Sequence, residues 1–170
     1  MRTGRRWVRF VCAVWLSGHC LTVPAAESKP DKKKSDAALQ RALRAVQAGN
    51  REEAIAAYSE AWTANPANAA ALYARGKLYL EAGDHEKAAA DFDQAVTSQP
   101  ADPLARVARA GFLRAVGQPR RAIQDYETAI GMKLERADVY SALGACYFDI
   151  RELSPALEKF SAAIRLRLDD

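Results

Sequence analysis

Apolar side chains recur along the chain at a constant interval of 34 residues. The interval divides the chain into four blocks, 35–68, 69–102, 103–136 and 137–170. Each block has an alanine, an aromatic residue four positions later and an alanine three positions after that: Ala54, Tyr58, Ala61; Ala88, Phe92, Ala95; Ala122, Tyr126, Ala129; Ala156, Phe160, Ala163. On a helix this spacing puts all three side chains on one face, where a second helix can approach closely. A fixed period indicates a tandem array of helix pairs rather than an ordinary helical bundle.

Glycine marks the turn between the two helices of a block. It recurs 15 residues into three blocks, at Gly49, Gly83 and Gly117. Glycine readily takes the left-handed conformation that a tight turn between helices requires. Arg151 stands at this position in the fourth block, so we expect a looser or strained turn there.

Two proline-containing pairs predict helix starts. Asp102 and Pro103 open the third helix pair, and Ser154 and Pro155 lie just beyond the fourth turn. In each pair we expect the first residue to cap the helix and the proline to occupy its first position.

Over residues 35–170 the chain resembles the tetratricopeptide-repeat family. Block 69–102 carries nearly the whole family signature, in Gly76, Tyr79, Ala88, Phe92, Ala95 and Pro100. Block 103–136 departs from it, with Ala110, Leu113 and Leu134 in place of the glycine, the tyrosine and the closing proline. The resemblance implies an all-α fold: an α-solenoid of four tandem 34-residue helix–turn–helix repeats in a right-handed superhelical array with a concave face.

Residues 1–26 have the features of a secretory signal peptide. A basic stretch up to Arg9 precedes an apolar run from Phe10 to Leu16, and small residues lead to an expected cleavage site after Ala25 or Ala26. The apolar run is shorter than the roughly 20 residues that span a bilayer. We therefore expect an exported protein, with the periplasm as its expected location. The alternative is a retained segment that tethers the protein to a membrane.

Residues 27–34 are polar and interrupted by Pro30, and they predict a short disordered linker. A bacterial lipoprotein site at Cys20 is disfavoured, because His19 stands where a small residue belongs.

The net charge of +4 comes from four arginines in the first 26 residues. Without them, the chain has 21 basic and 21 acidic residues. A neutral body offers no basic surface for phosphate contacts, so we do not expect nucleic-acid binding.

The sequence offers no catalytic, metal-binding or cofactor-binding set. After signal cleavage one histidine and one cysteine remain, His85 at a turn and Cys146 inside a helix, in blocks that are not adjacent. Non-adjacent blocks of a solenoid do not bring such side chains together. We expect Cys146 to be a core residue, and we expect neither an enzyme nor a bound metal or cofactor.

In the tetratricopeptide-repeat family the first helix of each repeat lines the concave face. The matching positions form a mostly apolar strip with isolated Lys77 and Arg114: Leu39, Leu43, Val46, Tyr73, Lys77, Leu80, Leu104, Val107, Arg114, Phe148. Some relatives use a Lys, Asn and Arg clamp for the acidic C-terminus of a chaperone; here the slots hold Leu39, Leu43, Ala74, Leu104 and Ala108, so no such clamp is expected. An apolar strip suits an amphipathic helix or an extended apolar peptide, although some of these residues could instead pack block against block.

The function that we predict is an exported, non-catalytic adaptor that binds a protein partner of unknown identity through the concave groove. The alternative is a membrane-tethered structural or assembly component that acts as a spacer or associates with itself. Self-association is expected because a solenoid needs a polar terminal cap, and the last helix carries a second apolar stripe, Leu157, Ile164 and Leu168, where a fifth block would dock. We expect this stripe to be covered by a second copy in a two-fold dimer or by a partner protein.

Overall fold

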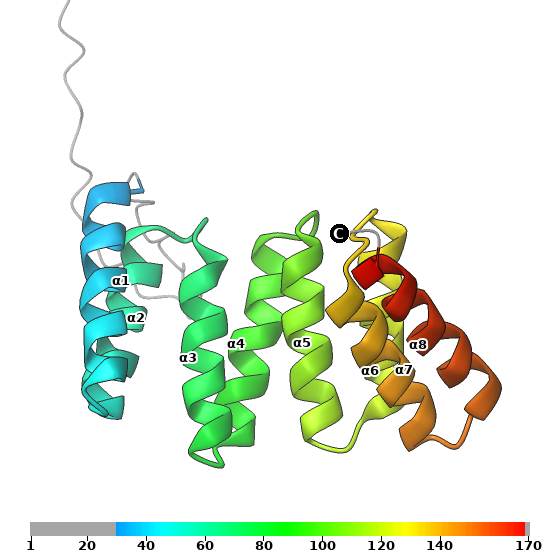
Figure 1. The fold of residues 1–170 in the computed structure, drawn as a ribbon. Coiled ribbons are helices and arrows are strands. Elements are labelled where there is room, and N and C mark those ends of the chain that lie inside the picture. The colour runs from blue at the N-terminus through cyan, green and yellow to red at the C-terminus, as the bar shows by residue number, and fades with distance from the viewer. Residues whose placement is uncertain (1–29, 169–170) are drawn as a thin grey trace, which may run out of the picture.

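A computed structural model describes residues 30–168 of the chain. In this range the chain forms eight helices, which follow one another in a row (Figure 1): α1 (Lys32–Gln47), α2 (Arg51–Ala64), α3 (Ala69–Glu81), α4 (His85–Ser98), α5 (Pro103–Ala115), α6 (Pro119–Gly131), α7 (Ala137–Asp149) and α8 (Leu153–Leu168). The all-α solenoid expected from the sequence is confirmed. Helices α3, α5 and α7 begin at the first residue of the blocks derived from the 34-residue period.

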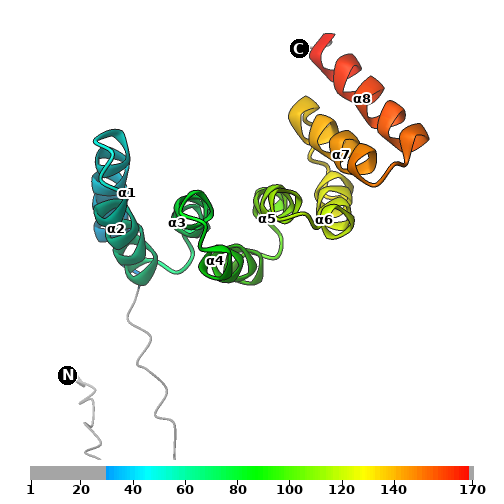
Figure 2. The same ribbon diagram turned by 90° about the horizontal axis from the view of Figure 1, so that it is seen from below.

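The helices pack as four antiparallel pairs that stack along an arc. Helix α1 packs on α2, α3 on α4, α5 on α6 and α7 on α8, and each pair contacts the next one. Seen along the helices, α3, α5 and α7 lie on the inner side of the arc and α4 and α6 on its outer side (Figure 2). The first helices of successive pairs also contact each other, α3 with α5 and α5 with α7. The inner side of the arc is therefore a concave surface made by the first helix of each pair.

The alanine–aromatic–alanine triplets form the interface within each helix pair. Their alanines are buried in all four blocks, and Tyr58, Phe92 and Tyr126 are buried between them. In two pairs the ring lies directly against a glycine: a Cβ added at Gly76 would stand 3.1 Å from the Phe92 ring, and one at Gly144 would stand 3.0 Å from the Phe160 ring. These distances are below ordinary van der Waals contact, so glycine allows the two helices to approach this closely.

The turns inside the helix pairs share one backbone conformation. Gly49, Gly83 and Gly117 have φ between 75° and 78°, and Arg151 has φ of 66°. The turn at Arg151 therefore keeps the geometry of the glycine turns, and it is strained rather than loose because a residue with a Cβ occupies the left-handed region.

The last helix begins two residues earlier than its proline predicts. Helix α8 starts at Leu153, so Ser154 is not its cap and Pro155 is its third residue. The carbonyl of Glu152 accepts the first helical hydrogen bond, from the Ala156 amide at 3.1 Å. Asn50, Asp84 and Gln118 accept the corresponding bonds in α2, α4 and α6. The register of the repeat therefore outweighs the local cap signal. At α5 the local signal is correct: Asp102 caps the helix and Pro103 is at its first turn.

The first helix begins inside the range assigned to the polar linker. Asp31 caps α1 by accepting from the Lys34 amide at 2.9 Å, and the Asp31 amide donates to the Ala64 carbonyl at 2.8 Å. This bond to the end of α2 holds the start of α1, so residues 32–34 are helical rather than part of a disordered linker. The expected signal peptide, residues 1–26, lies outside the described residues.

Candidate protein-interaction surface

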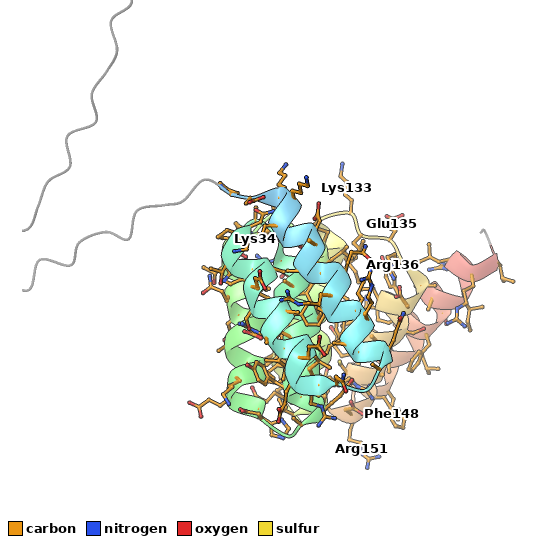
Figure 3. All side chains as sticks on the ribbon, turned by 90° about the vertical axis from the view of Figure 1, so that its left-hand side faces the viewer. Lys34, Lys133, Glu135, Arg136, Phe148 and Arg151 are labelled. Atoms are coloured by element: carbon orange, nitrogen blue, oxygen red, sulfur yellow. The ribbon has the colours of Figure 1, made fainter. Side chains whose placement is uncertain are left out.

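The concave surface exposes apolar side chains that the core does not use. Leu43 and Val46 on α1, Leu104 on α5 and Phe148 on α7 have 42–52% of their surface exposed. Figure 3 shows Phe148 extending outward near Arg151, at the turn of the last helix pair. Exposed leucine and phenylalanine side chains in a concave surface are typical anchors for a bound apolar segment.

The other apolar residues expected in the groove belong largely to the solenoid itself. Leu39, Leu80 and Val107 are half-buried and pack against the core clusters. Tyr73 is also half-buried, and its hydroxyl donates to the Asp102 carboxylate at 3.1 Å. This bond joins α3 to the residue that caps α5, and burial together with the Asp102 charge raises the pKa of Tyr73. Tyr73 therefore fixes one helix pair against the next.

One of the two cations expected to stand alone in the groove is paired. The guanidinium of Arg114 on α5 donates from Nε to the Asp149 carboxylate on α7 at 2.8 Å, and this contact raises the pKa of Arg114. The pair bridges two inner helices of adjacent blocks. Lys77 is exposed. The expectation of two isolated charges is thus wrong at Arg114, because its block-to-block neighbour carries a carboxylate.

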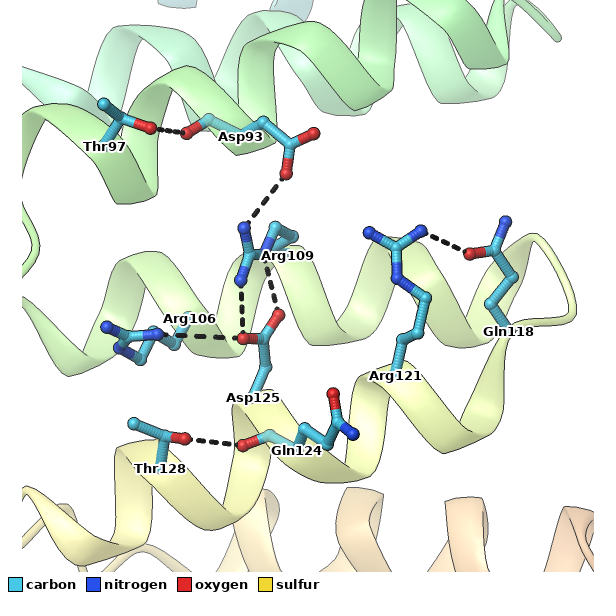
Figure 4. Close-up of polar contacts among 9 residues, drawn as sticks. All are labelled: Asp93, Thr97, Arg106, Arg109, Gln118, Arg121, Gln124, Asp125 and Thr128. Atoms are coloured by element: carbon cyan, nitrogen blue, oxygen red, sulfur yellow. Dashed lines mark hydrogen bonds and ion pairs between the residues drawn. The ribbon is translucent and has the colours of Figure 1, made fainter.

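Sequence reasoning missed a repeated arginine–aspartate pair between the helices. Arg75 donates from Nε and Nη2 to the two carboxylate oxygens of Asp91, at 2.8 and 2.6 Å, and from Nη1 to the Ser59 hydroxyl at 2.7 Å. One block later, Arg109 binds Asp125 in the same two-point manner at 2.7 Å and reaches Asp93 at 3.0 Å (Figure 4). Asp91 and Asp125 are both buried. The signal was available, since in both blocks an arginine precedes an aspartate by 16 residues.

The arginine network also lines a cleft away from the concave surface. The cleft has a volume of about 300 Å³ and lies between α4, α5 and α6, with Ala89, Phe112 and Val116 in its apolar lining and His85 and Arg121 in its polar lining. Asp93 and Arg109, which are paired with each other, also line it. Two of its charged residues therefore neutralise each other.

The two residues considered for nucleophilic chemistry lie in different environments. His85 is exposed at the first residue of α4, whereas Cys146 is fully buried in α7. Burial raises the pKa of the Cys146 thiol to about 11, so the thiol is protonated and unreactive at neutral pH. Among the described residues, no group of three or more His, Cys, Asp or Glu side chains could hold a metal ion.

The expected self-association stripe is exposed on α8. Leu157, Ile164 and Leu168 project from the C-terminal helix together with Leu153, which sequence reasoning did not include.

Within the described part of the chain, no helix combines the length and the apolar character that crossing a membrane requires.

The fold is similar to that of several solved proteins. A crystal structure of MamA matches with a TM-score of 0.70 at 18% sequence identity, over 82% of this chain and 81% of that chain. MamA from Desulfovibrio magneticus RS-1 matches with a TM-score of 0.69 at 18% identity, over 84% and 78%. The first TPR of Spaghetti (RPAP3), bound to the HSP90 peptide SRMEEVD, matches with a TM-score of 0.60 at 22% identity, over 75% and 96%.

The sequence itself places the chain in a family. No curated protein matches it significantly in a sequence search, whereas the family profile named Tetratricopeptide repeat matches residues 39–103 and 113–169. At such low identity the solved structures bear on the fold alone, but the profile covers well over half of the chain. The chain therefore belongs to the tetratricopeptide-repeat family, whose solenoids serve as protein-interaction scaffolds.

Proposed function

We propose that this protein is an exported, non-catalytic adaptor that binds a protein partner through its concave surface. The observation that carries the proposal is the set of exposed apolar side chains, Leu43, Val46, Leu104 and Phe148, on the first helices of three blocks. These side chains contribute little to the core, and their burial by a partner would remove apolar surface from water. Among the described residues, Arg114, one of the two cations expected in the groove, is paired with Asp149, so it is not free to bind an acidic partner.

The chemistry of the surface favours an apolar segment over an acidic tail. The Spaghetti (RPAP3) structure contains an HSP90 peptide with acidic residues near its end. Here leucine and alanine occupy the positions at which a basic clamp would stand, Leu39, Leu43, Ala74, Leu104 and Ala108. Such a surface suits an amphipathic helix or extended peptide anchored by two or three large apolar side chains.

Paired substitutions test the site. Leu104→Glu/Phe148→Glu puts charges where an apolar segment would bind, and both positions are exposed, so the solenoid should fold. The control is Ala90→Glu, at an exposed position of α4 on the outer side of the arc. In pull-downs from the cell-envelope fraction, analysed by mass spectrometry, we expect partners recovered with the wild type and the control to be lost with the double variant. Equal recovery with all three proteins would place binding elsewhere.

Export rests on the N-terminal sequence and has its own test. The intact mass of the protein recovered from the envelope fraction is expected to correspond to an N-terminus at Ala26 or Glu27. A full-length mass would instead support a retained membrane tether, and a lipid increment on Cys20 would support a lipoprotein. These outcomes are independent of whether the concave surface binds a partner.

A further inference from the structure

The C-terminal helix carries an apolar face that nothing in the described chain covers. Leu153, Leu157, Ile164 and Leu168 have 56–79% of their surface exposed. One block earlier, the positions that correspond to Leu157 and Ile164 lie on α6 and are covered: Ile123 is buried, and Ile130 packs against the core cluster that contains residues of α7. Helix α8 therefore presents the kind of surface that, elsewhere in the solenoid, receives another helix.

The first helix of a second copy does not fit this surface. In a head-to-tail arrangement the outer face of α1 would take the place of the next block. Arg44 on that face is exposed, whereas Leu78, Phe112 and Cys146 fill the equivalent position in α3, α5 and α7 and are buried. Gln40 and Arg41 are exposed as well. Docking α1 on α8 would place the charged Arg44 where a leucine, a phenylalanine or a cysteine is buried in the other blocks, and burying a charged side chain among leucines is unfavourable.

The stripe on α8 is symmetric about its own centre. Its four residues are separated by four, seven and four positions, a spacing that is the same in both directions along the helix. Two antiparallel copies of α8 would therefore set Leu157 against Ile164 of the second copy and Leu153 against Leu168. Ser161, which is small and exposed, lies next to the centre, where the two helices would approach most closely.

The charges beside the stripe are arranged about nearly the same centre. Glu158 follows Leu157, and Arg165 follows Ile164, so the two charged residues border the same side of the stripe seven positions apart. Both are exposed, and the only ion pair that either makes within the described chain joins Glu158 to its neighbour Lys159 at 2.8 Å. In an antiparallel pair, Glu158 of each copy would lie next to Arg165 of the other. Like charges would not be opposed on this side.

We propose that α8 pairs with α8 of a second copy of this chain, antiparallel about a two-fold axis, so that two solenoids join at their C-terminal ends. The proposal does not depend on partner binding by the concave surface. A self-complementary patch gives a closed dimer, whereas the polar face of α1 prevents growth into a filament. A helix of this length is only about 24 Å long. The interface is thus at the small end of specific interfaces, and we expect dissociation constants on the order of micromolar.

Charge reversal tests the arrangement with built-in controls. Glu158→Arg places two arginines opposite each other in the pair, and Arg165→Glu places two glutamates opposite each other. In sedimentation analysis over a wide concentration range, each single variant should dimerise at least about tenfold more weakly than the wild type. The double variant should recover dimerisation. An equimolar mixture of the two single variants should form a heterodimer, because both opposed pairs then have opposite signs.

Crosslinking locates the contact. In the full chain with Cys12→Ser and Cys20→Ser, Ser161→Cys adds one exposed thiol to the buried Cys146. A short bismaleimide should link Ser161→Cys chains into dimers and should leave Gln40→Cys chains, which carry the thiol on α1, monomeric. Linkage of Ser161→Cys only to Gln40→Cys chains would show head-to-tail contact and overturn the proposal.

A second outcome would also overturn it. If the wild type stays monomeric over the whole concentration range and Leu157→Glu changes only the capture of a different protein, that protein covers α8 and the second copy does not. Circular dichroism should show that Leu157→Glu keeps the wild-type helical content, since the residue is exposed.

Discussion

Arg151 is held in the left-handed region of backbone conformation, with φ of 66°, where the other three blocks have glycine. For a residue with a Cβ this conformation is unfavourable by about 1–2 kcal/mol. We expect Arg151→Gly to raise the free energy of unfolding by about 1 kcal/mol, because glycine removes this strain at some cost in chain entropy. Denaturant-induced unfolding measures the change.

The reverse substitution is the control for Arg151. A Cβ at Gly117 would have open space around it, so only its φ of 75° opposes a side chain. Gly117→Ala should therefore lower the free energy of unfolding by about 1 kcal/mol. If Arg151→Gly destabilises the protein, contacts of the arginine side chain outweigh the backbone strain.

The buried Cys146 thiol should make the fold less stable as the pH becomes alkaline. Its pKa is raised from an ordinary value of 9.0 to about 11 by burial, so the folded state favours the protonated thiol. The resulting stabilisation is fully present below pH 9 and is lost as the pH rises through about 11. We expect the free energy of unfolding of the wild type to fall more steeply over this range than that of Cys146→Ala. Parallel curves for the two proteins would contradict this.

At the scale of helix pairs, buried arginine–aspartate pairs join the two helices of the second and third blocks. Asp125→Ala would leave Arg109 half-buried with only Asp93 as a partner, and would remove the carboxylate 3.9 Å from Arg106. We expect a loss of about 3 kcal/mol in the free energy of unfolding, since removing one member of a buried pair leaves a desolvated charge. Thermal and denaturant unfolding give the value.

Replacing both partners separates the charge from the packing. Arg109→Met/Asp125→Leu removes the pair and fills the space with apolar atoms, so it should be considerably less destabilising than Asp125→Ala alone. An equal or larger loss in the double variant would mean that the hydrogen bonds themselves, and not the unpaired charge, account for the effect.

Across the whole molecule, stability should vary along the array because each helix pair is supported only by its neighbours. Helices α4, α5 and α6 have pairs on both sides, whereas α8 packs mainly on α7 and carries an exposed apolar face. Hydrogen exchange should therefore show the slowest amide exchange in α5 and α6 and the fastest helical exchange in α8. Uniform protection of all eight helices would indicate a single cooperative unit.

The sequence by itself determined the repeat, the helix order and the turns. The triplets and the glycines at one interval place the helices within a few residues, because close packing of two helices requires small side chains at fixed spacing and a tight turn requires a left-handed residue. The same pattern identified the apolar stripe on α8, since an amphipathic helix shows its second face in its sequence.

Only the tertiary structure decided which of the concave residues are free to bind. Leu43 and Leu39 look alike in sequence, but Leu39 packs against a core cluster formed by residues of α1, α2 and α3, whereas half of the surface of Leu43 is exposed. The pairing of Arg114 with Asp149 joins residues that are 35 positions apart and lie in adjacent blocks. The start of α8 at Leu153 likewise follows from its packing against α7, which overrides the local signal of Ser154 and Pro155. These features arise from contacts between elements, and such contacts are not encoded in the spacing of any one helix.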